Sequence, residues 1–214
     1  MNNNLIIKKF ETPIGEVECK LETSTDNCEL IATNNYENGT SETFKIGGYK
    51  IELVEFKIRQ PLYNGETILD SQGWIWRIDK IEDSNIKLNL SCQLINYPND
   101  IEFDTAHGEH LCAIEAYNEN WNLHIGTEDG EIMNERAERN DRFPTRLQEL
   151  VNFYESISQT KKNSIETIVP NLEVNESLHI HYLTAYDKPK IDSANTWFAV
   201  DEFKRKLENW IGIF

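Results

Sequence analysis

The chain has 214 residues, enough to bury a hydrophobic core in one large domain or two small ones. Hydrophobic residues make up 39% and aromatic residues 10% of it, which excludes an intrinsically disordered chain, because such chains lack the apolar side chains that offset the entropy of ordering. There are 37 acidic and 21 basic side chains, a formal net charge of −16, and a field of this sign repels nucleic acid and anionic membranes.

Short runs rich in β-branched and aromatic residues follow one another through the first part of the chain, separated by turn residues. They predict strands at 5–10, 16–22, 29–33, 43–46, 49–58, 73–78, 86–95, 111–117 and 121–125, with a polar loop at 34–40. The clearest alternation is in 86–95, where every second residue is apolar. We therefore expect antiparallel sheet, as a sandwich or an open barrel.

The pattern changes near Gly130. Residues 131–140 are highly charged and predict a helix, and 144–157 have apolar residues at i, i+3 and i+4 behind Pro144, which predicts a second one. Strands are predicted at 165–169 and 178–186, with 196–200 as a third, and Asp201 is expected to cap a final helix at 202–210.

The predicted fold class is therefore α+β. An antiparallel β-rich N-terminal part, residues 1–130, precedes a smaller helix-strand-strand-helix part, residues 131–214. The change at residue 130 either separates two domains or divides one domain with a shared core.

The cysteines and the N-terminus indicate a reducing compartment. Cys19, Cys28, Cys92 and Cys112 form no CxxC pair and are predicted to be buried thiols. The first residues lack the pattern of a secretory signal, and no apolar stretch approaches the roughly 20 residues that a membrane helix needs. We expect a cytoplasmic protein that does not associate with a membrane.

Four of the five histidines form two groups. His107 and His110 precede a predicted strand, whereas His179 and His181 share one face of another, since successive side chains alternate. If the groups met, they would offer imidazoles to zinc, with Glu109 as general base, in a metal-dependent hydrolase. The spacing differs from the HExxH motif, so the simpler interpretation is histidines that face solvent in a loop and on an edge strand.

Two further patterns have structural as well as functional interpretations. Four arginines recur three or four residues apart, at Arg136, Arg139, Arg142 and Arg146. In a row they would suit phosphate or carboxylate recognition, but the acidic residues between them favour intrahelical ion pairs.

Trp74 and Trp76 share a strand face and fit either a stacking platform or ordinary sheet core. No nucleophile elbow, P-loop or dinucleotide motif is present.

Acidic residues cluster around the first histidine group and around Gly130, with aromatic residues nearby. The predicted partner-binding residues are Asp100, Glu102, Asp104, Tyr117, Trp121, Glu128, Asp129, Glu131 and Glu135. A negative patch of this kind fits a basic groove, such as the substrate channel of a nuclease.

We therefore expect a protein without cofactor or catalytic residues that binds a basic protein. The predicted function is that of a bacterial immunity or inhibitor protein that neutralises a toxin such as a nuclease. The alternatives are the metal-dependent hydrolase, which would use His107, His110, His179 and His181, and an assembly subunit that self-associates.

Overall fold

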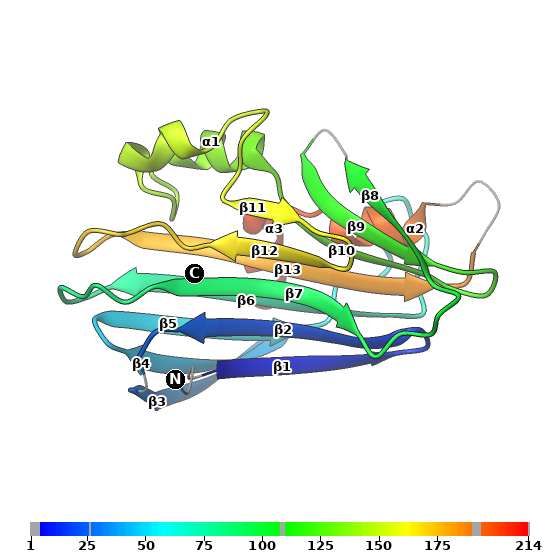
Figure 1. Ribbon diagram of the computed structural model, residues 1–214, viewed down its shortest axis with the longest axis horizontal. Helices are drawn as coiled ribbons and strands as arrows, with labels where there is room; N and C mark the ends of the chain where they lie inside the picture. The colour runs from blue at the N-terminus through cyan, green and yellow to red at the C-terminus, as the bar shows by residue number, and fades with distance from the viewer. Residues whose placement is uncertain (1–4, 26, 108–109, 190–193, 214) are drawn as a thin grey trace.

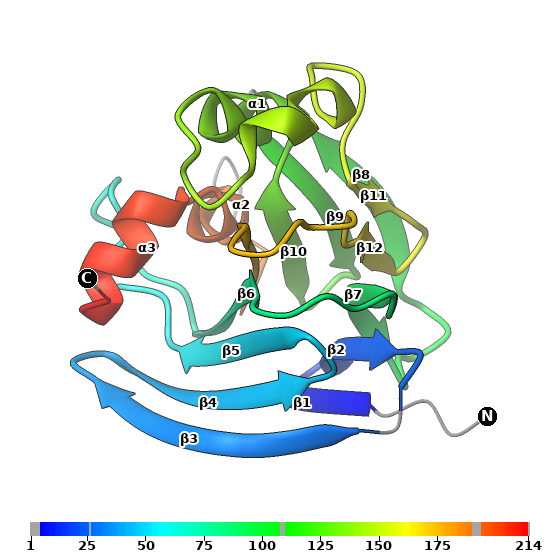
Figure 2. The ribbon, with the colours of Figure 1, turned by 90° about the vertical axis from the view of Figure 1, so that its left-hand side faces the viewer.

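The computed structural model describes residues 5–25, 27–107, 110–189 and 194–213, in which two antiparallel sheets pack face to face (Figures 1 and 2). One sheet has the strand order β1 (Leu5–Thr12), β2 (Gly15–Thr23), β7 (Leu88–Ile95), β12 (Ser164–Ile168), β11 (Ser158–Thr160). The other has the order β3 (Cys28–Tyr36), β4 (Gly39–Ile46), β5 (Tyr49–Phe56), β6 (Asp70–Lys80), β13 (Ser177–Asp187), β10 (Asn122–Glu128), β9 (Leu111–Tyr117), β8 (Glu102–His107). The α+β prediction is confirmed.

Four short helical segments accompany the sheets: α1 (Gly130–Glu138), the 3₁₀ helix η1 (Thr145–Leu150), α2 (Asn195–Val200) and α3 (Lys204–Ile211). In Figure 2, β3 to β5 lie at the bottom, β8 to β10 rise at the upper right, and α2 and α3 lie to the left of β10. No helix within the described ranges is long and apolar enough to cross a bilayer.

Two apolar layers follow from the alternation of side chains along the strands. The first fills the space between the sheets and contains Trp74 and Trp76, both fully buried. The second lies between the outer face of the eight-stranded sheet and helices α2 and α3, where Ile75 meets Leu207 and Ile211 in one cluster. The two tryptophans are thus sheet core, and the stacking platform is excluded for them.

Strands from both sides of residue 130 pair in each sheet. β13 is inserted between β6 and β10, and β12 pairs with β7. Because antiparallel sheets need neighbouring strands on both sides of a central strand, β6 and β10 depend on β13 for half of their ladder hydrogen bonds. Both faces of β13 are buried over most of its length.

Three predicted elements are wrong. The helix expected at 144–157 is only the 3₁₀ helix η1, after which the chain turns at Asn152 and leaves Tyr154 exposed. The third strand expected at 196–200 is helix α2, and Asp201 ends that helix instead of capping α3, which begins after Phe203. The polar loop expected at 34–40 is the turn of the β3–β4 hairpin with the ends of its two strands, and β8 was not predicted.

The position of β13 predicts that residues 1–130 do not fold alone. Without residues 131–214, β6 and β10 lose their shared partner and the outer face loses α3, so a fragment of residues 1–130 should lack the near-ultraviolet circular dichroism of packed tryptophans. A fragment that unfolds cooperatively, with tryptophan signals like those of the full chain, would contradict this prediction.

Candidate protein-binding groove and the buried charge network beside it

The second histidine group lies inside the molecule. His179 and His181 project from the outer face of β13 beneath α3, with exposed fractions of 0% and 1%. His179 Nε2 lies 3.1 Å from His181 Nδ1, and His179 Nδ1 lies 3.5 Å from Glu208 Oε1 on α3. The interpretation of these residues as solvent-facing on an edge strand is wrong, because β13 is a central strand.

A buried ion pair lies next to these histidines. Arg136 of α1 donates to Glu128 at the end of β10, and both side chains are almost wholly buried. The same guanidinium donates to the carbonyl oxygens of Arg142 and His179, each at 3.0 Å. The second carboxylate oxygen of Glu128 accepts the backbone N–H of Lys204 at 3.1 Å. The pair therefore fastens α1, the turn after it and α3 to the eight-stranded sheet.

Lys204 extends this network on the other side of α3. Its ammonium group lies 2.7 Å from Asp141 Oδ1 and 2.9 Å from Glu208 Oε2. Glu208 in turn faces His179. Carboxylates and cations thus alternate beneath α3, and a buried charge needs such compensation because transfer from water is costly.

The protonation states follow from this arrangement. Burial alone would raise the pKa of Glu128, but the charge of Arg136 and the Lys204 N–H outweigh it, and that pKa is lowered to about 2. Burial, with the nearby Arg136, lowers the pKa of both His179 and His181. The imidazoles are therefore neutral and enclosed, with the two rings bonded to each other on β13 and His179 facing Glu208 of α3.

The two histidine groups do not form a metal site in the part of the chain that is described. No group of three or more His, Cys, Asp or Glu residues is arranged there to hold a metal ion. His110 is partly buried, with its ring 5.8 Å from the ring of Phe203. The His107 side chain and the whole of Glu109 lie outside the described residues, so the hydrolase alternative stays a prediction.

The first acidic cluster gathers at one edge of the eight-stranded sheet. Glu102 and Asp104 are exposed on β8, and Glu102 accepts a hydrogen bond from Tyr117 Oη on β9 at 3.1 Å. Asp100 precedes β8, is exposed, and accepts a hydrogen bond at 2.9 Å from Asn118. We call these four predicted residues, Asp100, Glu102, Asp104 and Tyr117, the acidic edge.

Trp121 lies near the acidic edge but is not fully exposed. Its ring packs against Tyr186, with centroids 6.0 Å apart, and the Lys188 ammonium lies 6.0 Å from the same ring. Trp121 therefore packs edge to face against Tyr186 of its own sheet, which leaves only part of the indole surface open.

The second acidic cluster has mainly structural contacts. Glu128 is a correction to the predicted patch: it is 4% exposed and paired with Arg136, so it offers no carboxylate to a partner. Asp129 caps α1 by accepting the Ile132 N–H at 3.0 Å. Glu131 is partly buried in the first turn, and Glu135 is exposed but paired with Arg139 at 2.9 Å.

A groove of about 820 Å³ lies between the start of β9 and the segment that joins η1 to β11. In Figure 1 this segment descends beside α1 towards β11, facing the upper end of β9. Three carboxylates and no lysine, arginine or histidine are among its lining residues. The lining is Leu111, Cys112, Asp129, Gly130, Glu149, Leu150, Asn152, Phe153, Tyr154, Glu155, Ser156, Ser158, Gln159 and Thr160.

Two aromatic side chains stand out from this groove. Tyr154 is 89% and Phe153 71% exposed, the largest exposed fractions of any large hydrophobic side chain in the described residues. A compact turn holds them: Asn152 Oδ1 accepts the backbone N–H groups of Tyr154 and Glu155 at 2.8 and 3.1 Å. The two rings meet edge to face, 5.0 Å apart.

The first residue of α1 supports the turn from behind. A Cβ on Gly130 would lie 2.2 Å from the carbonyl oxygens of both Asn152 and Glu155, so only glycine allows this approach. The turn that presents the aromatic rings is therefore packed directly against the helix that Arg136 fastens to the sheet.

Sequence reasoning missed the groove because it placed Tyr154 on the apolar stripe of a helix. The available signal was Asn152, since an asparagine side chain that accepts the N–H two residues later forms a turn and competes with a helix.

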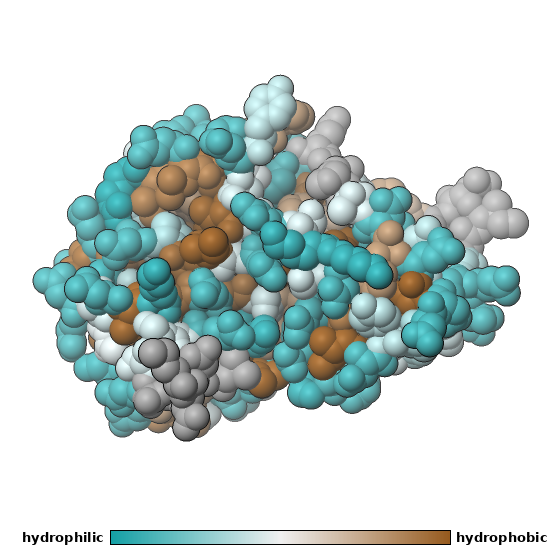
Figure 3. Space-filling model, viewed as in Figure 1, coloured by the Kyte–Doolittle hydropathy of each residue, from teal (hydrophilic) through white to brown (hydrophobic). Residues whose placement is uncertain are grey.

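Further apolar surface is visible in Figure 3, where a brown area at the upper left lies over η1 and the neighbouring ends of β12 and β13. Leu150 of η1, Ile168 of β12 and Val174 of the connection between β12 and β13 are exposed apolar residues.

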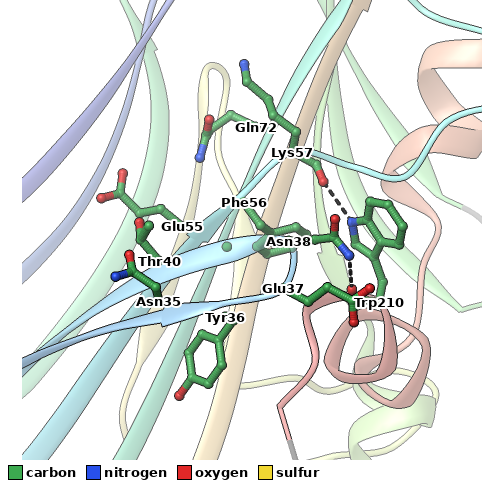
Figure 4. A pocket seen from close by; sticks show the side chains of 11 residues that line it. Asn35, Tyr36, Glu37, Asn38, Thr40, Glu55, Phe56, Lys57, Gln72 and Trp210 are labelled. Atoms are coloured by element: carbon green, nitrogen blue, oxygen red, sulfur yellow. Dashed lines mark hydrogen bonds between the residues drawn. The ribbon is translucent and has the colours of Figure 1, made fainter.

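A second hollow, of about 570 Å³, lies where the β3–β4 hairpin meets α3 (Figure 4). Here Asn38 Nδ2 donates to the Trp210 carbonyl oxygen at 2.7 Å, and Trp210 Nε1 donates to the Lys57 carbonyl oxygen at 3.1 Å. The first bond holds the end of α3 against the hairpin, and the second holds it against the residue that follows β5. The contacts of Asn38 and Trp210 in this hollow are therefore contacts within the fold.

Neither the protein-family models nor the curated proteins compared with this chain include a match to it. The functional assignment therefore depends on the geometry of its own residues.

Removing Arg136 should be far more harmful than removing its neighbour on α1. Arg136→Ala leaves Glu128 buried without its partner and should lower the free energy of unfolding by roughly 3–5 kcal/mol. Arg139→Ala removes an exposed pair and should cost about 0.5 kcal/mol or less. Urea unfolding of the two variants measures the difference, and equal losses would contradict the structural role of Arg136.

Stability should fall as the solution becomes acidic. Burial lowers the pKa of His124 to about 4, and the pKa values of His179 and His181 are also lowered, so the unfolded chain binds protons more readily than the folded one. This contribution is complete above about pH 6.5 and is lost as the pH falls below it, by about 3 kcal/mol for His124 alone. Urea unfolding at several pH values tests the sign: stability that is constant or greater below pH ~6 would contradict it.

Proposed function

We propose that this protein binds a basic protein through the acidic groove and neutralises it, as an immunity or inhibitor protein does with a toxin such as a nuclease. The observation that carries the proposal is the combination of Phe153 and Tyr154, both highly exposed, with a groove lined by carboxylates and by no basic side chain. Exposed aromatic side chains in a concave surface are typical of interfaces and rare elsewhere on a protein surface.

The two kinds of side chain would have different roles. Tyr and Phe supply large contact areas with few rotatable bonds, so they lose little entropy when a partner covers them. Glu149 and Glu155, both exposed, line the groove beside them, and the net charge of −16 attracts a basic partner from a distance. Affinity would therefore come mainly from the aromatic anchors, and rapid association from the charge.

The acidic edge would give the same partner a second region of contact. β9 connects the two regions: Leu111 and Cys112 line the groove at its start, and Tyr117 belongs to the acidic edge at its end, roughly 20 Å away at about 3.4 Å per residue. A partner of ordinary interface size, about 800 Å² on each side, would reach from the groove towards this edge.

Neutralisation by occlusion needs no catalytic group in the inhibitor. The substrate channel of a nuclease is basic because it binds phosphates, and a carboxylate-lined surface with protruding aromatic rings would compete for it. A partner of this kind would be met in the cytoplasm, which is where we place the protein. We also propose that the protein is bacterial and acts there as an immunity protein.

The first experiment is recovery of the partner from its source cell. Tagged full-length protein is incubated with extract, washed at low and then high salt, and the retained proteins are identified by mass spectrometry. We expect one basic protein in stoichiometric amount, with association that is slower at high salt. Recovery of an acidic protein, or of none at either salt concentration, would contradict the proposal.

Variants then test the groove. Tyr154→Ser and Phe153→Ser should each weaken binding of the recovered partner by about 30-fold, corresponding to about 2 kcal/mol for an aromatic anchor. Leu30→Ser is the matched control, because Leu30 is 53% exposed on β3, a strand with no residue in the groove, and it should change the affinity less than about twofold. Affinity that depends on Leu30 and not on Tyr154 would place the interface elsewhere.

A further inference from the structure

Two cysteines of the five-stranded sheet lie directly opposite each other. Cys19 on β2 pairs with Cys92 on β7, and both are fully buried in the core between the sheets. Trp76 Nε1 lies 3.3 Å from Cys19 Sγ and donates to it. Neither of the other cysteines has such a partner, because Cys28 is opposite Ile46 and Cys112 is opposite Thr127.

The hydrogen bonds of β7 show which kind of pair this is. Leu94 donates its N–H to the Asn163 carbonyl oxygen at 2.9 Å, and the Leu88 carbonyl oxygen accepts from Val169 at 3.2 Å. Because peptide groups alternate in direction along a strand, Cys92 also directs its peptide groups towards β12 and away from β2. Cys19 and Cys92 therefore form a non-hydrogen-bonded pair, the type in which opposite Cα atoms are closest, at about 4.5 Å.

This spacing allows a disulfide. Bridged cysteines have Cα atoms about 4.4–6.8 Å apart, so a non-hydrogen-bonded pair lies at the short end of the range. A bridge at the short end is strained and more easily reduced than a typical one. Burial, together with a hydrogen bond to Cys19, raises the pKa of Cys92 well above its usual value, so the folded thiol is a poor nucleophile.

We propose that Cys19 and Cys92 form a reversible cross-strand disulfide when the chain folds, or locally opens, in the presence of a small-molecule disulfide such as glutathione disulfide. One protein thiolate attacks glutathione disulfide, giving a mixed disulfide and releasing one glutathione. The second cysteine then displaces the other glutathione. The protein loses two electrons and two protons, and one glutathione disulfide becomes two glutathione molecules.

The bridge would join the two strands at the centre of the five-stranded sheet and close the loop between them, which restricts the unfolded chain. The strained pair would be a dithiol in a reducing compartment and a disulfide in an oxidising one. Such a bridge lies in the core between the sheets and does not depend on the proposed binding function.

The test uses full-length protein with all four cysteines, refolded in glutathione buffers of increasing oxidising ratio. Free thiols are alkylated, and the peptides are mapped by mass spectrometry with and without reduction. We expect a single linked pair of peptides that contain Cys19 and Cys92, with Cys28 and Cys112 alkylated. The thermal unfolding midpoint of the oxidised form should be several degrees higher than that of the reduced form.

Two variants complete the experiment. Cys28→Ala/Cys112→Ala should still form the bridge, and the same variant with Cys19→Ala added should not, with no difference between its midpoints in oxidising and reducing buffer. The proposal is overturned if all four thiols of the natural sequence stay free, if Cys28 or Cys112 appears in the linked peptides, or if Cys19 and Cys92 carry glutathione without linking. Mapping of the natural sequence decides the question even where a variant fails to fold.

Discussion

The pairing of β13 with β6 on one side and β10 on the other is the constraint on which the rest of the structure depends. It joins β3 to β6 with β8 to β10 in one sheet, although about fifty residues separate β10 from β13 in the chain. It also places two histidines on a face that α3 covers. Glu208 from α3, and Arg136 bonded to the His179 carbonyl oxygen, provide contacts to this strand.

The buried charges connect this central strand to the groove. Glu128 ends β10, Asp129 caps α1, and Gly130 packs against the turn that presents the aromatic rings. These three consecutive residues thus have three distinct structural roles, which explains why an acidic segment that resembles a binding patch is mostly occupied with its own fold. The carboxylates open to a partner lie on either side of it, on β8 and around the groove.

The strands could be predicted because their side chains alternate between core and exterior, as in β2 and β7. β8 was not predicted because Phe103 is the only large apolar residue in it, so its sequence lacks a clear alternation of apolar and polar residues. The 144–157 helix was wrong for a different reason: Leu147 and Val151 are buried as helical spacing requires, but the Asn152 side chain takes the N–H groups that would continue the helix. Local spacing cannot distinguish the two outcomes.

The site was harder to predict than the fold. Neither the burial of Glu128 nor that of His179 and His181 is visible in the sequence, because each depends on which strand is central and on where α3 packs. The exposure of Phe153 and Tyr154 likewise depends on the turn at Asn152. Composition did indicate an acidic surface, but tertiary structure determines which of its carboxylates are free.

Hydrogen–deuterium exchange of the full-length protein, with and without its recovered basic partner, locates the surface that binds the partner. Binding at the groove predicts slower exchange in 149–160 and at the start of β9, with β3 unchanged. Protection confined to β3, or to the hollow between the β3–β4 hairpin and α3, would contradict it.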